Sequence, residues 1–302
     1  MMEKGDPGHY PVVFFIRAHQ FPEFVADTID SIRFYAETDP LIVVTVDRTL
    51  RVEAELKHSY PDVMYYTTQS NCGWGGGLFR LFCESVCWLA RDKGISFDVL
   101  WNVDYDLIPI RPGFDTYFQQ RFQGQPTVGQ IGRFNPNSQF WKRRMRTQLS
   151  RLKKTFAEFG KQWPKNYAVG EHVAGACGIF KGKCVAQMLA SGLLDSPFRD
   201  LGVQCQLADD PMLSLMVNAA GYTFKEMGEK AFIKWKMETD YRAVPGKGYY
   251  VYHPTKLVPG NQPYSVQAEL ECRNFFRRLR GQGEITLLKD TPLTGRPNSI
   301  TC

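Results

Sequence analysis

The sequence lacks several features that would assign it to well-defined classes. No apolar run approaches the roughly 20 residues that cross a bilayer, and residues 1–8 are polar, without the apolar stretch of a secretory signal. We therefore expect a cytoplasmic protein. The eight cysteines form no C-x-x-C pair and follow no regular spacing. This favours small buried hydrophobic side chains over a disulfide framework or a zinc site.

An excess of positive charge is also missing from most of the chain. There are 37 Lys and Arg against 31 Asp and Glu, but seven of the basic residues lie between 142 and 154, a segment without acids. The remainder holds 30 basic and 31 acidic residues, so its surface has no general attraction for polyanions.

The first hundred residues alternate between apolar runs and amphipathic segments. We expect strands at 11–16, 41–46, 63–67 and 99–104, and helices at 23–34, 51–58 and 78–91. This order predicts an α/β fold with a single doubly wound, Rossmann-like and mainly parallel sheet. The segments that follow these strands then meet at one carboxyl edge, where such sheets bind ligands.

One of these segments is acidic. The apolar run 99–103 is followed by Asp104 and Asp106. Two carboxylates one residue apart at a strand end can reach one divalent cation from the same side, and such a cation neutralises a diphosphate. Two aspartates with this spacing are usually just solvent-exposed residues of a loop, but here the pair lies at the expected ligand-binding edge of the sheet. The pattern therefore indicates nucleotide chemistry.

A glycine cluster follows the third expected strand. Residues 71–77 read Asn-Cys-Gly-Trp-Gly-Gly-Gly and precede a helix, so their backbone N–H groups can approach an anion. The cluster matches neither a P-loop nor the G-x-G-x-x-G pattern, and a plain turn is the alternative. Trp74 is suited to form one wall of a sugar or base pocket, with packing beneath the loop as the alternative.

The order of four segments resembles the GT-A fold nucleotide-sugar glycosyltransferases over about residues 11–255. They are Arg17-Ala18-His19-Gln20 after the first strand, Asp47 after the second, the Asn71-Cys72-Gly73 turn, and Asp104-Tyr105-Asp106. Gly175-Ala176-Cys177-Gly178-Ile179-Phe180 is similar to the acceptor-side strand of that family, and Ala208-Asp209-Asp210-Pro211 to its acidic general-base motif. His253 is similar to the late histidine that completes the metal site in many members. The resemblance implies one domain over 1–302. A nucleotide-binding half spans 10–110, an acceptor-binding half 111–260 with a helical insertion at 137–164, and a C-terminal helix and tail 261–302.

The resemblance also implies an activity. This activity is the transfer of a hexosyl or N-acetylhexosaminyl group from a nucleoside-diphosphate donor to a hydroxyl of a glycan or lipid-linked acceptor. The expected donor is a UDP-sugar. The reaction is expected to invert the anomeric centre and to add a single sugar. Asp210 is then the general base, and Asp209 orients it or binds the acceptor. A Mn²⁺ or Mg²⁺ ion is held by Asp104, Asp106 and His253. The donor contacts are Arg17, His19, Asp47, Asn71, Gly73, Trp74, Gly76 and Asp104, and the acceptor contacts are Gly175, Ala176 and Trp141.

The sequence departs from the family pattern at several points. Asp47 is followed by Arg48 rather than by a second acid, and no Gln-x-x-Arg-Trp motif occurs, which argues against a processive polysaccharide synthase. The turn Trp74-Gly75-Gly76, together with Asp104-Tyr105 and Pro109-Ile110, also faintly resembles the core-2 N-acetylglucosaminyltransferase and xylosyltransferase group. Its members typically work without metal, so a metal-independent reaction stays open. An N-cap role is the structural alternative for Asp210, which precedes Pro211, and a plain loop histidine is the alternative for His253.

The basic segment predicts an amphipathic helix. Between 139 and 163 the large apolar side chains fall within an arc of about 80° at 100° per residue. They are Trp141, Met145, Leu149, Leu152, Phe156, Phe159 and Trp163. We expect Asn137 or Ser138 to cap the helix and Pro164 to end it. Such a helix can lie on the anionic inner surface of a membrane, cover an acceptor groove, or pack its apolar stripe on the domain.

Other functions remain as alternatives. The aromatic side chains of the basic helix share one face and the charges the other, so we expect no nucleic-acid partner. A sugar-phosphate nucleotidyltransferase would need a Gly-rich basic loop after the first strand, where 17–20 contain no glycine. A non-catalytic protein that binds nucleic acid or an anionic surface is the third alternative. At the C-terminus we expect a helix at 265–279, with Val266, Leu270 and either Phe276 or Leu279 on its apolar side, and a loosely held tail from 285.

Overall fold

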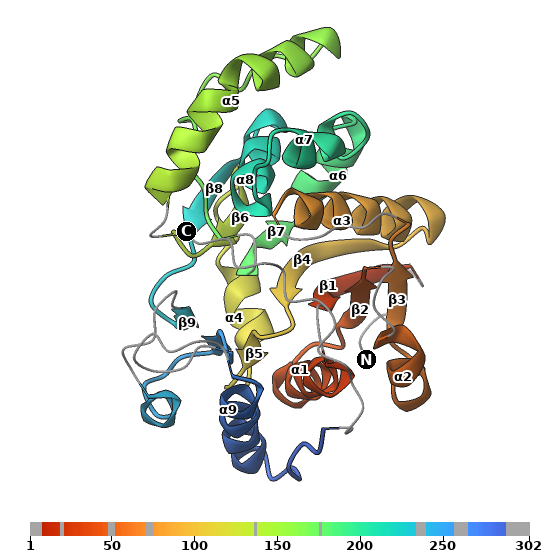
Figure 1. The fold of residues 1–302 in the computed structure, drawn as a ribbon, viewed down its shortest axis with the longest axis vertical. Coiled ribbons are helices and arrows are strands. Elements are labelled where there is room, and N and C mark those ends of the chain that lie inside the picture. Colours follow the sequence, from red (N-terminus) through yellow and green to blue (C-terminus); the bar gives the residue numbers. More distant parts are fainter. Residues whose placement is uncertain are drawn as a thin grey trace.

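The computed structural model describes residues 8–18, 21–47, 52–69, 75–135, 138–174, 177–233, 240–256 and 265–287. A seven-stranded sheet lies at its centre, with the order β3-β2-β1-β4-β7-β6-β8 (Figure 1). The strands are β1 (His9–Ala18), β2 (Leu41–Val46), β3 (Met64–Thr67), β4 (Ser96–Asp104), β6 (Val128–Gly132), β7 (Ile179–Lys181) and β8 (Thr223–Glu226). Pairing is parallel from β3 to β4, and β7 runs antiparallel to both of its neighbours. The predicted doubly wound, mainly parallel α/β sheet is confirmed.

Helices cover both faces of this sheet because its central strands are apolar on both sides. On β1, Phe14 and Ile16 face one hydrophobic layer, whereas Val13 and Phe15 face the other. The first layer is built with α1 (Pro22–Tyr35), α2 (Val52–Ser59) and α4 (Phe114–Gln120). The second is built with α3 (Gly76–Cys87), α5 (Ser138–Glu158), α6 (Gly182–Ala190), α7 (Phe198–Gln204) and α8 (Asp209–Ala219). A short π-helix, Trp88–Asp92, continues α3.

A smaller sheet adjoins the carboxyl end of β4. It pairs β5 (Ile108–Pro109) with β10 (Val251–His253), and β10 with β9 (Ala231–Ile233). The C-terminal helix α9 (Val266–Leu279) packs on it through Cys272 and Phe276. Since only three residues separate the end of β4 from the start of β5, this sheet brings late segments of the chain next to the acidic turn.

The basic helix α5 lies along the outside of the second layer and leans away from the body at one end of the molecule (Figure 1). Met145, Leu152 and Phe156 are buried against the core, so packing of the apolar stripe on the domain is confirmed for these residues. The predicted extent was wrong at its C-terminal end. The helix stops at Glu158 because Gly160 adopts a φ of +65°, and Lys161 N–H then bonds the Phe156 carbonyl at 2.7 Å.

The predicted apolar stripe of the basic helix also included Phe159, which lies beyond the end of α5 and is 52% exposed. Of the two alternatives on the C-terminal helix, Phe276 is buried, whereas Leu279 is 54% exposed. Part of the expected tail is also held in place. The Ile285 N–H donates to Asn274 Oδ1 at 2.8 Å, and the side chains of Ile285 and Leu287 pack on the first hydrophobic layer. Within the described ranges, each helix is too short or too polar to cross a bilayer.

Candidate active site

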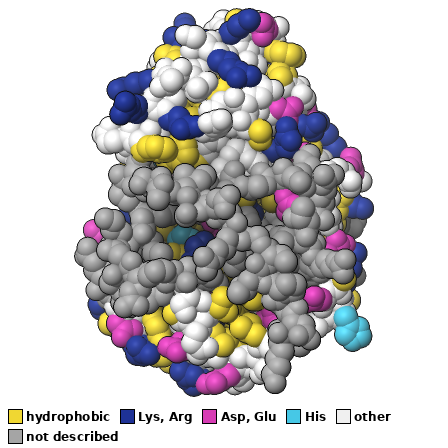
Figure 2. Space-filling view, viewed as in Figure 1, with side chains coloured by type: hydrophobic (Ala, Val, Ile, Leu, Met, Phe, Trp, Pro, Cys, Tyr) yellow, Lys and Arg dark blue, Asp and Glu magenta, His cyan; other side chains and the backbone are white. Residues whose placement is uncertain are grey.

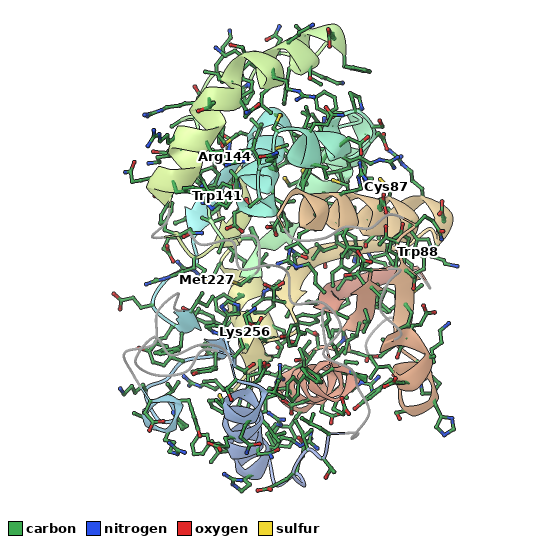
Figure 3. All side chains as sticks on the ribbon, in the orientation of Figure 1. Cys87, Trp88, Trp141, Arg144, Met227 and Lys256 are labelled. Atoms are coloured by element: carbon green, nitrogen blue, oxygen red, sulfur yellow. The ribbon has the colours of Figure 1, made fainter. Side chains whose placement is uncertain are left out.

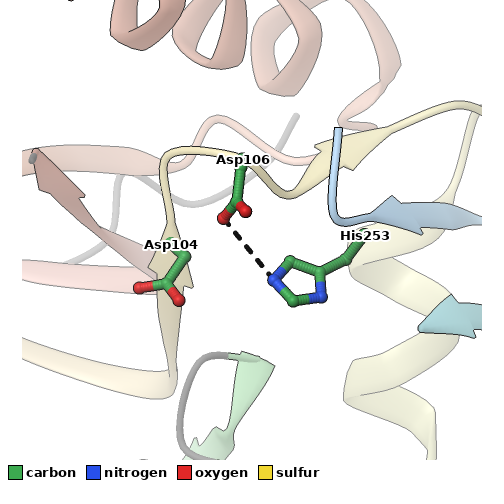
Figure 4. A group of neighbouring side chains, drawn as sticks. All are labelled: Asp104, Asp106 and His253. Carbon is green, nitrogen blue, oxygen red and sulfur yellow. Dashed lines mark ion pairs between the residues drawn. The ribbon is translucent and has the colours of Figure 1, made fainter. Parts of the chain in front are cut away.

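Three potential metal ligands converge where β4 ends. Asp104 is the last residue of β4, Asp106 lies in the turn that leads into β5, and His253 ends β10. One ligand atom of each lies within 4.8 Å of the others (Figure 4). His253 Nε2 is 3.5 Å from Asp106 Oδ1. Two carboxylates and an imidazole suit a divalent cation, so the three residues predicted as metal ligands are brought together. We refer to Asp104, Asp106 and His253 as the acid cluster.

The burial of Asp106 fits a cation-binding role. Its side chain is fully buried, and neither of its oxygens has a well-oriented hydrogen-bond donor among the described residues. A buried carboxylate is costly unless a positive charge faces it. Here that charge is Lys256, whose Nζ lies 3.0 Å from Asp106 Oδ2. Burial alone would raise the pKa of Asp106, but Lys256 and His253 outweigh it and hold the pKa well below its usual range.

The backbone of the acidic turn is fixed by side chains from distant segments. The carbonyl of Tyr105 accepts hydrogen bonds from Thr28 Oγ1 of α1 and, at 2.7 Å, from Arg273 Nη2 of α9. The carbonyl of Asp106 accepts one from the N–H of Thr255 at 2.9 Å. The turn is therefore held by its main chain, which leaves the two aspartate side chains to face the site.

Arg273 belongs to a buried ionic cluster that sequence reasoning missed. It donates to Asp27 Oδ2 at 2.9 Å and to Glu269 Oε1 at 3.0 Å, and Arg280, the residue that follows α9, pairs with Asp27 at 2.5 Å. All four side chains are fully buried. The signal available in the sequence was the i,i+4 pair Glu269 and Arg273 on the same helical face as Phe276. Such a pair is ordinarily interpreted as solvent-exposed.

A second buried cation links the acid cluster to the start of α8. Arg17 on β1 lies in register with Asp104 on β4 and is 2% exposed. Its Nη2 is 2.5 Å from Asp104 Oδ1, and its Nη1 is 2.5 Å from Asp209 Oδ2. The guanidinium thus positions two acids from different halves of the chain. The expected donor contact of Arg17 stays a prediction.

The single guanidinium of Arg17 faces three nearby carboxylates, those of Asp104, Asp209 and Asp210. The pKa of Asp209 reflects this excess of negative charge. Burial raises this pKa to about 6 against the opposing charge of Arg17, and the carboxylates of Asp210 and Asp104 add to the rise. Asp210 is less buried than Asp209, and Asn135 Nδ2 donates to its Oδ2 at 3.2 Å. Asp210 is therefore the more accessible of the two acids.

The N-cap alternative for Asp210 is wrong. The helix α8 begins at Asp209, its N-cap residue is Ala208, and no side chain caps it. Asp209 and Asp210 are the first two helical residues, and Pro211 is the third. Both carboxylates lie in the first turn, where the helix dipole favours negative charge. Capping therefore does not account for Asp210.

Of the remaining predicted site residues, the structure describes Gly76, Trp141 and Asp47. Gly76 lies at the start of α3 against Gly202 of α7, and a Cβ on Gly76 would come within 2.2 Å of the Gly202 carbonyl carbon. Close helix packing thus gives Gly76 a structural role. Trp141 on α5 packs on the second layer, in a region well separated from Lys256 (Figure 3). Asp47 directly follows β2 at the carboxyl edge. The predicted residues His19, Asn71, Gly73, Trp74, Gly175 and Ala176 lie outside the described residues.

No protein-family model matches the sequence, and neither does any curated protein. Similar solved structures include the mannosyltransferase PcManGT from Pyrobaculum calidifontis with GDP-Man and Mn²⁺, at 13% identity and a TM-score of 0.43 over 72% of this chain and 55% of that one. Glucosyl-3-phosphoglycerate synthase from Mycobacterium tuberculosis with Mn²⁺, UDP-glucose and glycerol 3-phosphate has 13% identity and a TM-score of 0.39, over 72% and 70%. The mannosyltransferase Ktr4p from S. cerevisiae has 10% identity and a TM-score of 0.47, over 94% and 86%.

Proposed function

We propose that this chain is a GT-A glycosyltransferase that moves a sugar from a nucleoside diphosphate to a hydroxyl acceptor. The observation that carries the proposal is the convergence of the acid cluster and the Asp209–Asp210 pair, joined by Arg17, at the carboxyl edge of a mainly parallel sheet. Ligands bind at this edge in open α/β sheets. The site therefore has carboxylates that can bind a cation next to the leaving group and a carboxylate that can take the proton from the acceptor hydroxyl.

At the donor end, Asp104, Asp106 and His253 would hold Mn²⁺ or Mg²⁺. Such an ion, when bound, neutralises the diphosphate as it leaves. The first donor to test is a UDP-sugar, since the sequence resemblance implies it. The hydrogen bonds to the carbonyls of Tyr105 and Asp106 support this role, because metal ligands must be held in a fixed geometry by the residues around them.

At the acceptor end, Asp210 is the proposed general base. Its carboxylate takes the hydroxyl proton while the hydroxyl oxygen attacks the anomeric carbon, and the bond from that carbon to the β-phosphate oxygen breaks. A nucleoside diphosphate leaves, and a single displacement inverts the anomeric centre. Asn135 orients the Asp210 carboxylate, and Arg17 holds Asp209 beside it.

The test is a transfer and hydrolysis assay with UDP-, GDP-, CMP- and dTDP-sugars. Asp210→Asn should lower acceptor transfer by about 10²–10⁴-fold and leave donor binding intact. Asp106→Asn should impair both acceptor transfer and donor binding. The matched control is Asp62→Asn, an exposed acid paired with Arg33 at the opposite edge of the sheet. Full activity in EDTA would contradict the metal role, and an active Asp210→Asn with a dead Asp209→Asn would reverse the assignment of the base.

We further propose that the outer face of α5 lies against an anionic lipid leaflet that carries the acceptor. Its exposed cations include Arg143, Arg146, Lys153 and Lys154, and among described residues only Glu158 pairs with one of them, Lys154 at 3.6 Å. Figure 2 shows Lys and Arg gathered over the end of the molecule where α5 lies. Because the apolar stripe is packed on the core, the contact would be electrostatic, with Phe140 as an exposed aromatic beside it.

A further inference from the structure

The reaction proposed above leaves one charge beside the acid cluster without a role, that of Lys256. Its ammonium lies 3.0 Å from Asp106 Oδ2 and 5.8 Å from the centre of the Tyr105 ring. Asp106 is the most deeply buried acid of the cluster, and of the residues that the structure describes Lys256 is its nearest cation. The carboxylate that a divalent ion would need is therefore already engaged by a side chain of the protein.

The surroundings of Lys256 fix its backbone but not its head group. The preceding residue, Thr255, is buried, donates its N–H to the Asp106 carbonyl and donates its hydroxyl to Glu269 at 2.9 Å. The Lys256 side chain, by contrast, is 41% exposed. A lysine stem has four rotatable carbons, so its ammonium can leave Asp106 while the main chain stays in place.

An ammonium and a divalent cation cannot share Asp106 without cost. Both would lie within a few ångströms of the same buried carboxylate, where like charges repel more strongly than in water. A nucleoside diphosphate resolves the conflict because its phosphate oxygens accept hydrogen bonds from an ammonium and also ligate the metal.

We propose that Lys256 occupies Asp106 in the resting protein and moves to the diphosphate when nucleotide and divalent ion bind, so that the two ligands bind cooperatively through this side chain. The inference rests on the proposed use of a nucleoside-diphosphate donor. It makes Lys256 a competitor of the metal in the free protein and a contact of the leaving group in the loaded one. The cooperativity is reciprocal: Mn²⁺ tightens UDP by the factor by which UDP tightens Mn²⁺.

The experiment is a titration of the full chain with Mn²⁺, followed by electron paramagnetic resonance of the free ion, with and without UDP. The wild type should bind Mn²⁺ weakly alone and at least tenfold more tightly with UDP. Lys256→Met should bind Mn²⁺ alone at least tenfold more tightly than the wild type, and UDP should add little. Lys183→Met, which removes an exposed lysine of α6, is the matched control and should behave as the wild type.

A second variant isolates the contact itself. In an Asp106→Asn background, Lys256→Met should no longer change Mn²⁺ affinity, because the carboxylate for which the two cations compete is gone. Unchanged Mn²⁺ affinity and unchanged UDP coupling in Lys256→Met alone would overturn the role of Lys256 and leave the proposed function standing. Failure of UDP to bind the wild type with or without Mn²⁺ would overturn the cooperativity together with the proposed donor.

Discussion

The acidic turn at 104–106 and the outer face of α5 both concentrate charge, but they satisfy it in opposite ways. Around the turn, carboxylates and guanidinium groups are buried and paired: Arg17 with Asp104 and Asp209, and Arg273 with Asp27 and Glu269. On α5 the charges are exposed and nearly all of one sign. Both regions contain arginines, so residue type alone does not distinguish them.

The difference lies in what each arrangement can do. A buried ion pair adds little net stability, but separating its partners leaves an uncompensated buried charge, which is costly. The two side chains and the segments that carry them are therefore held at a fixed distance. Exposed charges are screened within about 10 Å at moderate salt and fix no geometry, although together they create a field that attracts an oppositely charged surface. The first arrangement suits a catalytic turn, and the second suits a docking face.

The largest effect should come from breaking the buried side of this comparison. Arg273→Met leaves the buried Glu269 carboxylate without its ionic partner and removes one of the two donors to the Tyr105 carbonyl. We expect the free energy of unfolding, measured with urea, to fall by about 3–5 kcal/mol. The control is Arg278→Met on the same helix, whose pair with Glu284 is exposed and should change stability by less than about 1 kcal/mol. Equal effects would mean that the ionic cluster does not hold the turn.

The inner face of α5 should behave as core, unlike its outer face. Leu152→Ala removes a fully buried side chain and should cost about 2–5 kcal/mol by the same measurement, since the cavity collapses only in part. Leu279→Ala makes the same chemical change at a 54% exposed position and should stay within about 0.5 kcal/mol. A mild Leu152→Ala would show that α5 is only loosely attached to the body.

The pH dependence of stability should reveal the crowding of acids around Arg17. Because the pKa of Asp209 is raised to about 6 in the folded state, the native protein binds more protons than the unfolded chain between about pH 4 and 6. The stability that Asp209 contributes is therefore present at low pH and is lost as pH rises through this window, by an amount on the order of 3 kcal/mol. Denaturation of wild type and Asp209→Asn across pH 4–7 checks this, since the variant should lack the decline. A decline of equal size in both proteins would assign it to another group.

The smallest effect on stability should come from the outer face of α5. Changing Arg143, Arg146 and Lys153 to Gln should alter the free energy of unfolding by no more than about 0.5 kcal/mol. Co-sedimentation with anionic vesicles should nevertheless fall sharply, because each basic residue near such a surface contributes about 1 kcal/mol. The control replaces three exposed lysines elsewhere, Lys93, Lys183 and Lys230. Failure of the wild type to bind anionic vesicles at low salt would remove the membrane proposal.

Local patterns in the sequence predicted much of the fold. The alternation of apolar runs and amphipathic segments placed β1 to β4 and α1 to α3 within a few residues, and the spacing of Asp104 and Asp106 marked the ligand edge. The resemblance added His253, which the structure brings to the same point. These features depend on neighbours in the chain and on the two-residue period of a strand, and both can be read without a three-dimensional structure.

The tertiary structure decided which charges meet. Arg273 pairs with Asp27, 246 residues away in the sequence, and Arg17 pairs with Asp209, 192 residues away. The sequence around these residues does not indicate which partner each one has. The residues next to Lys256 in the sequence do not indicate its partner, yet folding places its ammonium on a buried carboxylate. The reason is physical: the energy of a charge depends on its burial and on the charges around it, and both arise only when distant segments pack together.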